Sequence, residues 1–317
     1  MFPENWVHQA KLRIAPHIQQ TELHFDPDLN IYLKLENRQV TGSFKARGAL
    51  NKILSLNPWE AEKEIVAASA GNHGQGVALA GRIVNARVTV FCSENTIPSK
   101  IQAMQRLGAS VQLVPGGYGE AEQAGKSHAA ESGAIWSSPY NDSQVIAGQG
   151  TSALEVIDEA PELKDATWIV PVGGGGLIAG IGAAIKVAPS KARLVAVQSI
   201  ASSYFYEIYT KGSQDGVIEY PSIADGLAGS VEESSITIPL VESLVDEFIL
   251  VTEEEIEQAI AFAWLRYHEI IEGSAASALA AALTGKVSSR PAVLLISGGN
   301  IQPEIHEGIL KKHRGLA

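Results

Sequence analysis

The chain has little cysteine and no concentration of positive charge, and each shortage excludes a class of protein. Cys92 is the single cysteine among 317 residues, so neither an internal disulfide nor a zinc site built from cysteines is possible. The formal net charge is −11, and no basic cluster appears along the chain. Because neutralising phosphates requires a surplus of lysine and arginine, we expect no nucleic-acid partner. The lone cysteine also fits a reducing compartment, so we expect a cytoplasmic location.

Long apolar runs are scarce as well. Residues 166–185 have the length of a membrane span and contain no charged residue, but Pro171 and four consecutive glycines would break a spanning helix. The first 16 residues have neither the apolar core of a signal peptide nor the composition of a transit peptide. We therefore interpret 166–185 as a buried strand, a loop and a buried helix, and expect no membrane partner.

Short apolar runs alternate with helical patterns in two blocks of the sequence, which is typical of βαβ units and parallel sheets. The pattern predicts an α/β protein with two open parallel-sheet lobes and an active site in the cleft between them. We expect a small domain at 56–140 and a large domain made of 1–55 and 141–317, with residues 199–250 irregular. The predicted strands are 64–69, 87–92, 110–115, 134–136, 167–172, 193–199 and 292–297.

Three glycine-containing loops follow predicted strands, where open α/β sheets bind ligands. The loop 69–74 could hold a carboxylate on its amides, and 173–176 has no side chains to obstruct a phosphate. The loop 297–300, SGGN, follows the last strand. Lys45 precedes a helical pattern, where a fixed ammonium is disfavoured, so a neutral and nucleophilic lysine is one explanation. Together these features suit pyridoxal phosphate carrying an amino acid.

The segments SFKARGA, SAGNHGQGVA, PVGGGGLIAGI and ISGGN resemble the fold-type II pyridoxal-phosphate enzymes, which share a tryptophan synthase β-like fold. Within them, the chain looks most like the threonine/serine dehydratase and serine racemase branch. The resemblance implies β-elimination of L-threonine or L-serine to a 2-keto acid and ammonia by a homodimer or homotetramer. We expect an amino acid as the small-molecule substrate.

The resemblance also assigns residues by position. Lys45 matches the lysine that binds the cofactor covalently and removes the Cα proton, and Ser297 matches the hydroxyl facing the pyridine nitrogen. Asn72 matches the asparagine at the phenolic oxygen, and Glu272 an acidic residue near the ring. The further cofactor-binding matches are Phe44, Gly173, Gly174, Gly175, Gly176 and Leu177, and the substrate-carboxylate matches are Ser69, Ala70, Gly71, Asn72 and His73.

Departures from the resembling branch bear on the reaction. Serine racemases carry a serine where this chain has Ala70, and a methyl group cannot donate the second proton that racemisation needs. Gln198 and Ser202 stand where that branch has acidic metal ligands, so we expect no metal dependence. A 3-hydroxyaspartate dehydratase stays an alternative, although we locate no cation for the extra carboxylate. A cofactor-binding protein without turnover is the alternative from another class.

Two further expectations concern residues outside the loops. Arg47, Lys34 and Glu36 lie near the candidate lysine, and we interpret them as structural ion pairs. The sequence continues for about 17 residues beyond Asn300, so we expect no C-terminal regulatory domain of the kind found in biosynthetic threonine dehydratases.

Overall fold

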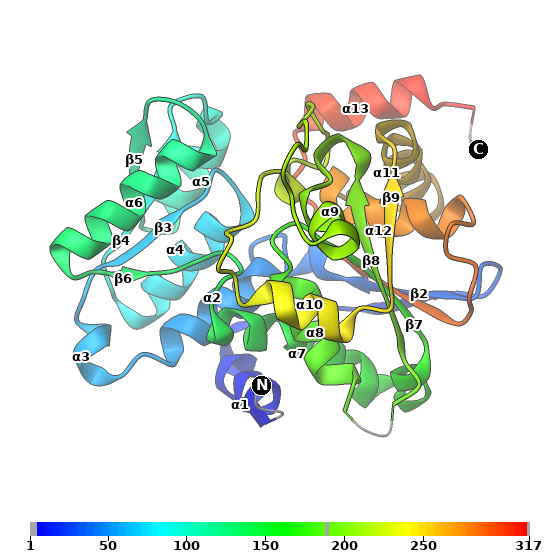
Figure 1. Cartoon of the computed structure of the whole chain (residues 1–317), viewed down its shortest axis with the longest axis horizontal. Helices are drawn as coiled ribbons and strands as arrows, with labels where there is room; N and C mark the ends of the chain where they lie inside the picture. The colour runs from blue at the N-terminus through cyan, green and yellow to red at the C-terminus, as the bar shows by residue number, and fades with distance from the viewer. Residues whose placement is uncertain (1–4, 188–189, 316–317) are drawn as a thin grey trace.

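The computed structural model describes residues 5–187 and 190–315, which form two sheets with helices on both faces (Figure 1). The smaller sheet has the strand order β5-β4-β3-β6, and the larger has the order β1-β2-β10-β7-β8-β9. Every strand pairing is parallel except β1 with β2. The strands are β1 (Leu23–Asp26), β2 (Ile31–Leu35), β3 (Ile65–Ala68), β4 (Val88–Ser93), β5 (Ser110–Val114), β6 (Ile135–Trp136), β7 (Thr167–Pro171), β8 (Arg193–Ser199), β9 (Glu247–Val251) and β10 (Ala292–Ile296).

Helices connect the strands and cover the sheets, with α2 between the two sheets in Figure 1. The helices are α1 (Asn5–Ile14), α2 (Lys45–Leu54), α3 (Pro58–Ala61), α4 (Asn72–Val84), α5 (Pro98–Arg106), α6 (Tyr118–Ser132), α7 (Ser143–Glu159), α8 (Gly176–Ile185), α9 (Tyr204–Lys211), α10 (Thr237–Leu244), α11 (Glu253–Tyr267), α12 (Gly273–Leu283) and α13 (Pro303–Lys312).

The alternation of side chains along β10 explains why its sequence, AVLLI, is apolar throughout. Ala292, Leu294 and Ile296 pack with α11 and α12 on one face of the large sheet. Val293 and Leu295 pack with α7 and α8 on the other face. A parallel strand buried on both faces has no solvent side, so every position is apolar. The small sheet follows the same rule, with α2, α4 and α5 on one face and α6 on the other.

The predicted alternation of strands and helices is confirmed, and the differences lie in the large sheet, at both of its edges and at the strand next to one edge. The sequence analysis did not identify β1, β2 or β9, and the region 199–250 contains α9, α10 and β9. Strand β1, LHFD, is short and half polar, whereas β2, IYLKL, and β9, EFILV, are largely apolar and were missed all the same. β1 is antiparallel, so the large sheet is mixed rather than wholly parallel.

The division into domains stays a prediction, and the packing bears on both of its parts. β1 and β2 join the large sheet, as expected for the first 55 residues. Helix α2 contributes Ala46, Leu50 and Ile53 to the apolar core of the small sheet, so this helix contacts both lobes. The chain ends of the predicted large domain, 1–4 and 316–317, lie outside the described residues.

The uncharged stretch 166–185 contains β7, the glycine loop and α8, as the sequence analysis expected. Within residues 5–187 and 190–315, no helix combines the length and the apolar character needed to cross a membrane. The two strands β7 and β10 are neighbours and parallel, so the loops after them leave the sheet at the same edge. This edge collects the residues of the candidate site.

Candidate active site

The glycine loop 173–176 connects β7 to the N-terminus of α8. Gly175 has φ +85°, a left-handed conformation that side chains other than glycine rarely adopt. A Cβ atom on Gly174 would lie 2.3 Å from the ring of Tyr140, so the loop has no room for a side chain there. No side chain caps α8, and the first turn of an α-helix has amide N–H groups without intrahelical partners. The loop therefore offers donors and a positive helix end to an anion such as a phosphate.

Lys45 is the first residue of α2, and its ammonium is held inside the structure. Nζ donates a hydrogen bond to the Pro139 carbonyl at 2.9 Å and lies 5.2 Å from the centre of the Phe44 ring. Burial lowers the pKa of Lys45 from 10.5 to about 8, while the negative charge of Glu272 opposes this shift. A lysine with this pKa has a larger neutral, nucleophilic fraction near pH 7 than an exposed lysine.

The loop after β10 is attached to the segment that carries Lys45. The Phe44 amide donates to the Ser297 carbonyl at 3.0 Å, and Ser43 forms a β-bridge with Gly298. Ser297 is buried, with 2% of its surface exposed. These contacts place the predicted lysine and the predicted pyridine-facing serine next to each other, although they are separated by about 250 residues of sequence.

Asn72 begins α4 and contacts two polar residues from the large-sheet side. Its Nδ2 donates to Glu272 Oε1 at 2.8 Å, and its Oδ1 accepts from Asn300 Nδ2 at 2.6 Å. The backbone amide of Asn300 also donates to Glu272 Oε2 at 3.2 Å. Burial raises the pKa of Glu272 from 4.5 to about 7, and the hydrogen bond from Asn72 acts in the opposite direction.

Residues 69–73 comprise the turn after β3 and the first two residues of α4, and they lie beside the same cluster. Ser69 Oγ accepts the Gly71 amide at 3.1 Å, so this hydroxyl is engaged in the turn itself. His73 Nε2 lies 2.9 Å from the Ser137 carbonyl, which assigns the proton to that nitrogen. Burial and the Lys45 charge lower the pKa of His73 to about 3, so its ring is neutral.

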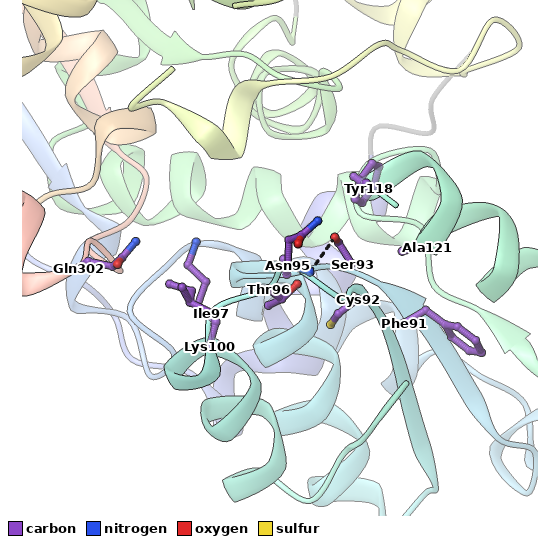
Figure 2. A pocket seen from close by; sticks show the side chains of 12 residues that line it. Phe91, Cys92, Ser93, Asn95, Thr96, Ile97, Lys100, Tyr118, Ala121 and Gln302 are labelled. Carbon is purple, nitrogen blue, oxygen red and sulfur yellow. Dashed lines mark hydrogen bonds between the residues drawn. The ribbon is translucent and has the colours of Figure 1, made fainter. Parts of the chain in front are cut away.

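A cavity of about 440 Å³ opens beside Ala70 (Figure 2). Its walls include Ser93, Asn95 and Lys100 from the small-sheet side and Gln302 from the segment after β10. The Lys100 ammonium donates to Asp225 Oδ2 at 3.0 Å, and Asp225 belongs to the region that the sequence analysis did not interpret. The sequence analysis located no cation for a second substrate carboxylate; the structure shows Lys100 in the wall of a cavity that Ala70 also lines.

The interpretation of Arg47, Lys34 and Glu36 as structural ion pairs is confirmed, with Glu155 of α7 as a fourth member. Arg47 donates to Glu36 at 2.7 Å and to Glu155 at 2.6 Å, and Lys34 Nζ lies 2.6 Å from Glu155. All four side chains are buried. The network connects β2, α2 and α7. Because Arg47 belongs to the same helix as Lys45, these ion pairs fix the position of the helix that carries Lys45.

The two positions compared with a metal site have other partners. Gln198 Oε1 accepts the Tyr206 amide at 3.1 Å, and Ser202 Oγ donates to Glu219 Oε1 at 2.8 Å. Glu219 is an acidic neighbour that sequence spacing did not reveal. Among residues 5–187 and 190–315, one group brings three possible ligand atoms within 4.8 Å of one another, Glu254 with Glu257 and His313, and Lys312 pairs with both carboxylates.

Three residues at the site had no assigned role in the sequence analysis. Tyr140 packs on Gly174 and Thr237 Oγ1 donates to the Gly174 carbonyl at 2.8 Å, so both shape the glycine loop. Neither residue lies in a motif, and no sequence signal identifies them. Asn300 is different, because it ends the quoted segment SGGN and is the only residue of that segment with a side-chain amide.

The residues present fit pyridoxal phosphate. The glycine loop accepts no Cβ at Gly174 and offers unpaired helix amides, which suits a phosphate. Lys45 is an amine with a lowered pKa, which suits an aldehyde. Ser43 Oγ is buried with no hydrogen-bond partner in the structure, so the site holds a polar atom for which the protein supplies no partner.

Comparison with known proteins agrees with this chemistry. The chain belongs to the family of pyridoxal-phosphate dependent enzymes, which it matches over residues 14–298. The predicted family, fold class and cofactor are therefore confirmed.

Individual relatives are more specific. The catabolic L-threonine dehydratase of Staphylococcus aureus (strain USA300) is 40% identical to this chain, and the match covers 98% of this chain and 92% of that protein. An L-threonine ammonia-lyase of Geobacter sulfurreducens is 40% identical over 95% of this chain and 76% of its own length. The structure of maize serine racemase is similar with a TM-score of 0.88 at 30% identity, covering 98% of this chain and 97% of that one.

Proposed function

We propose that this enzyme eliminates the β-hydroxyl of L-threonine, L-serine or both, and releases a 2-keto acid and ammonia. The observation that carries the proposal is Lys45, an amine with a pKa of about 8. Its neighbour Phe44 bonds the Ser297 carbonyl, and its Nζ bonds Pro139, the residue before the Tyr140 ring that packs on the glycine loop. The similarity to named threonine dehydratases supports the choice of substrate. The racemase-like fold is compatible with the proposal, because Ala70 has no proton to donate.

The residues have distinct roles in this reaction. Lys45 takes the Cα proton of the bound amino acid onto Nζ, which is efficient because its pKa lies near the working pH. The amides of the loop 69–73 hold the substrate carboxylate, and those of 173–177 hold the phosphate. Bound pyridoxal phosphate supplies the electron sink for the pair left at Cα. The Cβ–O bond would then break and the hydroxyl would leave as water, taking up one proton to balance the one that Lys45 removed from Cα. Hydrolysis of the resulting enamine consumes one water and gives the keto acid and ammonia.

The test is to load the protein with pyridoxal phosphate, add L-threonine without metal, and follow 2-oxobutanoate and ammonia. We expect equal amounts of both products and their loss in Lys45→Ala. A matched control is Lys52→Ala. Lys52 belongs to the same helix as Lys45 but pairs with Asp142. Cofactor absorbance that changes with threonine while no keto acid forms would contradict the proposal and favour a binding protein. Formation of D-serine from L-serine would favour a racemase.

A second candidate function is the dehydration of 3-hydroxyaspartate, and Lys100 is the observation that favours it. This ammonium lies at the cavity beside Ala70, where it could pair with a second substrate carboxylate if that carboxylate displaced Asp225. The comparison is kcat/KM for 3-hydroxyaspartate and threonine, in the native chain and in Lys100→Met. Loss confined to 3-hydroxyaspartate would support this candidate, and equal losses would reject it.

The remaining proposals concern organisation. The resemblance supports a homodimer or homotetramer, which light scattering during gel filtration tests by mass. It also supports a small domain at 56–140, for which limited proteolysis near residues 55 and 140 is the test. A cytoplasmic location is proposed from the single cysteine, and fractionation of the source cells tests it.

A further inference from the structure

Asn300 makes three hydrogen bonds that leave its side chain one orientation. Its Nδ2 donates to the Thr41 carbonyl at 2.9 Å, and a backbone carbonyl can only accept. The same Nδ2 donates to Asn72 Oδ1 at 2.6 Å, while the backbone amide of Asn300 donates to Glu272 at 3.2 Å. Both side-chain N–H groups of Asn300 therefore donate hydrogen bonds. A flip of the Asn300 amide would place its oxygen against the Thr41 carbonyl and lose that bond.

This fixed donor determines which way the Asn72 amide points. Because Asn300 presents an N–H group, Asn72 must turn its Oδ1 toward it, and its Nδ2 then faces Glu272 at 2.8 Å. If the Asn72 amide were flipped, its N–H group would face the N–H group of Asn300. Its oxygen would then face the oxygen of an ionised Glu272, and neither pair could form a hydrogen bond. One N–H of Asn72 Nδ2 is used by Glu272, and the second remains available to a ligand.

The elements involved are far apart in the sequence. Asn72 starts α4 on the small-sheet side, whereas Glu272 precedes α12 and Asn300 follows β10 on the large-sheet side. The amide of Asn72 is thus oriented from the opposite side of the site, by a residue whose side chain is itself held by the Thr41 carbonyl. Such an arrangement serves to present one chemical group of Asn72, a donor and not an acceptor, to what binds beside Lys45.

We propose that Asn300 is a positioning residue: through the chain Thr41–Asn300–Asn72 it keeps an N–H of Asn72 directed at the phenolic oxygen of pyridoxal phosphate. The proposal rests on the proposed function only in taking this cofactor oxygen as the partner of Asn72. It predicts that Asn300 variants lose recognition of that oxygen in particular, and keep the contacts made to the phosphate and the aldehyde.

The experiment compares two ligands and does not depend on turnover. Dissociation constants are measured by protein fluorescence for pyridoxal phosphate and for its 3-deoxy analogue, which lacks the phenolic oxygen. The proteins are the native chain, Asn300→Asp, Asn300→Ala and the control Asn51→Ala. Asp has the shape of Asn but presents oxygens to Asn72, and Ala removes the donor without imposing an acceptor. Asn51 is also buried and bridges two helices, donating to the Gln144 carbonyl at 2.7 Å.

We expect the native chain and Asn51→Ala to bind pyridoxal phosphate about tenfold more tightly than the analogue, as for one hydrogen bond to a charged group. Asn300→Asp should lose this preference, with pyridoxal phosphate weakened about tenfold and the analogue unchanged. Asn300→Ala should lose part of it. If Asn300→Asp does not fold, the Ala variant gives the same comparison with a smaller effect.

Three results would overturn the proposal. Equal weakening of both ligands would make Asn300 a structural residue only, and unchanged binding of both would remove any role. Absence of a preference in the native chain would show that Asn72 does not bind the phenolic oxygen. None of these touches the proposed reaction, because keto acid release by the native holoenzyme is measured separately and fails or succeeds by itself.

Discussion

Glu272 gives a quantitative test of the electrostatics of the site. The residue is 8% exposed, and burial raises the pKa of its carboxyl from 4.5 to about 7. The hydrogen bonds from Asn72 and the Asn300 amide stabilise the carboxylate but do not offset the loss of water. The two values differ by about 2.5, and each unit corresponds to about 1.36 kcal/mol, so ionised Glu272 costs the folded apoprotein about 3 kcal/mol.

The sign follows from proton binding. Between pH 4.5 and 7 the folded chain keeps the Glu272 proton that the unfolded chain has released, so the folded state binds more protons. The stability of the apoprotein should therefore fall as pH rises through this window, and Glu272→Gln should lack this fall. The difference in unfolding free energy between variant and native chain should shift by about 2–3 kcal/mol in favour of the variant from pH 5 to 8.

The assay is urea unfolding of the two apoproteins at several pH values, with Glu36→Gln as a control of opposite sign. Burial opposes the ionisation of Glu36, but Arg47 and Lys34 together hold its pKa below 4.5. The native chain should lose stability relative to Glu36→Gln only as the pH falls below about 4.5. Parallel pH curves for the native chain and Glu272→Gln would refute the reasoning, because Glu272 would then titrate alike in both states.

Three other changes test the remaining parts of the site. Gly174→Ala should weaken pyridoxal phosphate binding at least about tenfold in an absorbance titration, because its Cβ would meet an aromatic ring at 2.3 Å, whereas Gly308→Ala, with no atom within 4 Å, should not. Ser297→Asp should raise the ratio of transamination to elimination products by chromatography, because an aspartate keeps the pyridine nitrogen protonated, and an unchanged ratio would contradict this. Arg47→Met should cost about 3–5 kcal/mol of stability in urea unfolding by leaving two buried carboxylates unpaired, whereas the exposed pair lost in Arg193→Met should cost at most about 1 kcal/mol.

The fold was predictable where the local pattern is strong. Strands such as β7 and β10 are almost wholly apolar because both of their faces are covered, and glycine loops mark where they end. The edge strand β1 was missed because LHFD is short and half polar, whereas β9, EFILV, was missed although four of its five residues are apolar. The elements of the region 199–250 were not predicted because they are short and are stabilised by hydrogen bonds between residues well separated in the sequence. Ser202, for example, bonds Glu219 and Gly229.

The candidate site was predictable to the extent that its groups lie in short, distinctive segments. Lys45, Asn72, the glycine loop and Ser297 could be named because a lysine, an amide, a phosphate-sized gap and a hydroxyl follow recognisable patterns. Tyr140 and Thr237 could not, because they act by packing against Gly174 from other parts of the chain, and packing partners have no local sequence signal.

The sequence by itself determined which chemistry is available: an amine, glycine loops after parallel strands, and the absence of clustered basic residues and of cysteine pairs. Hydrophobic periodicity also determined the order of the buried elements, since burial on both faces restricts residue type locally. Only the tertiary structure decided the state of these groups. The pKa of Lys45, the proton affinity of Glu272 and the orientation of the Asn72 amide depend on burial and on partners, such as Pro139 and Asn300, brought together across the two sheets. Electrostatic interactions and hydrogen bonds act over a few ångströms in space, whatever the separation along the chain.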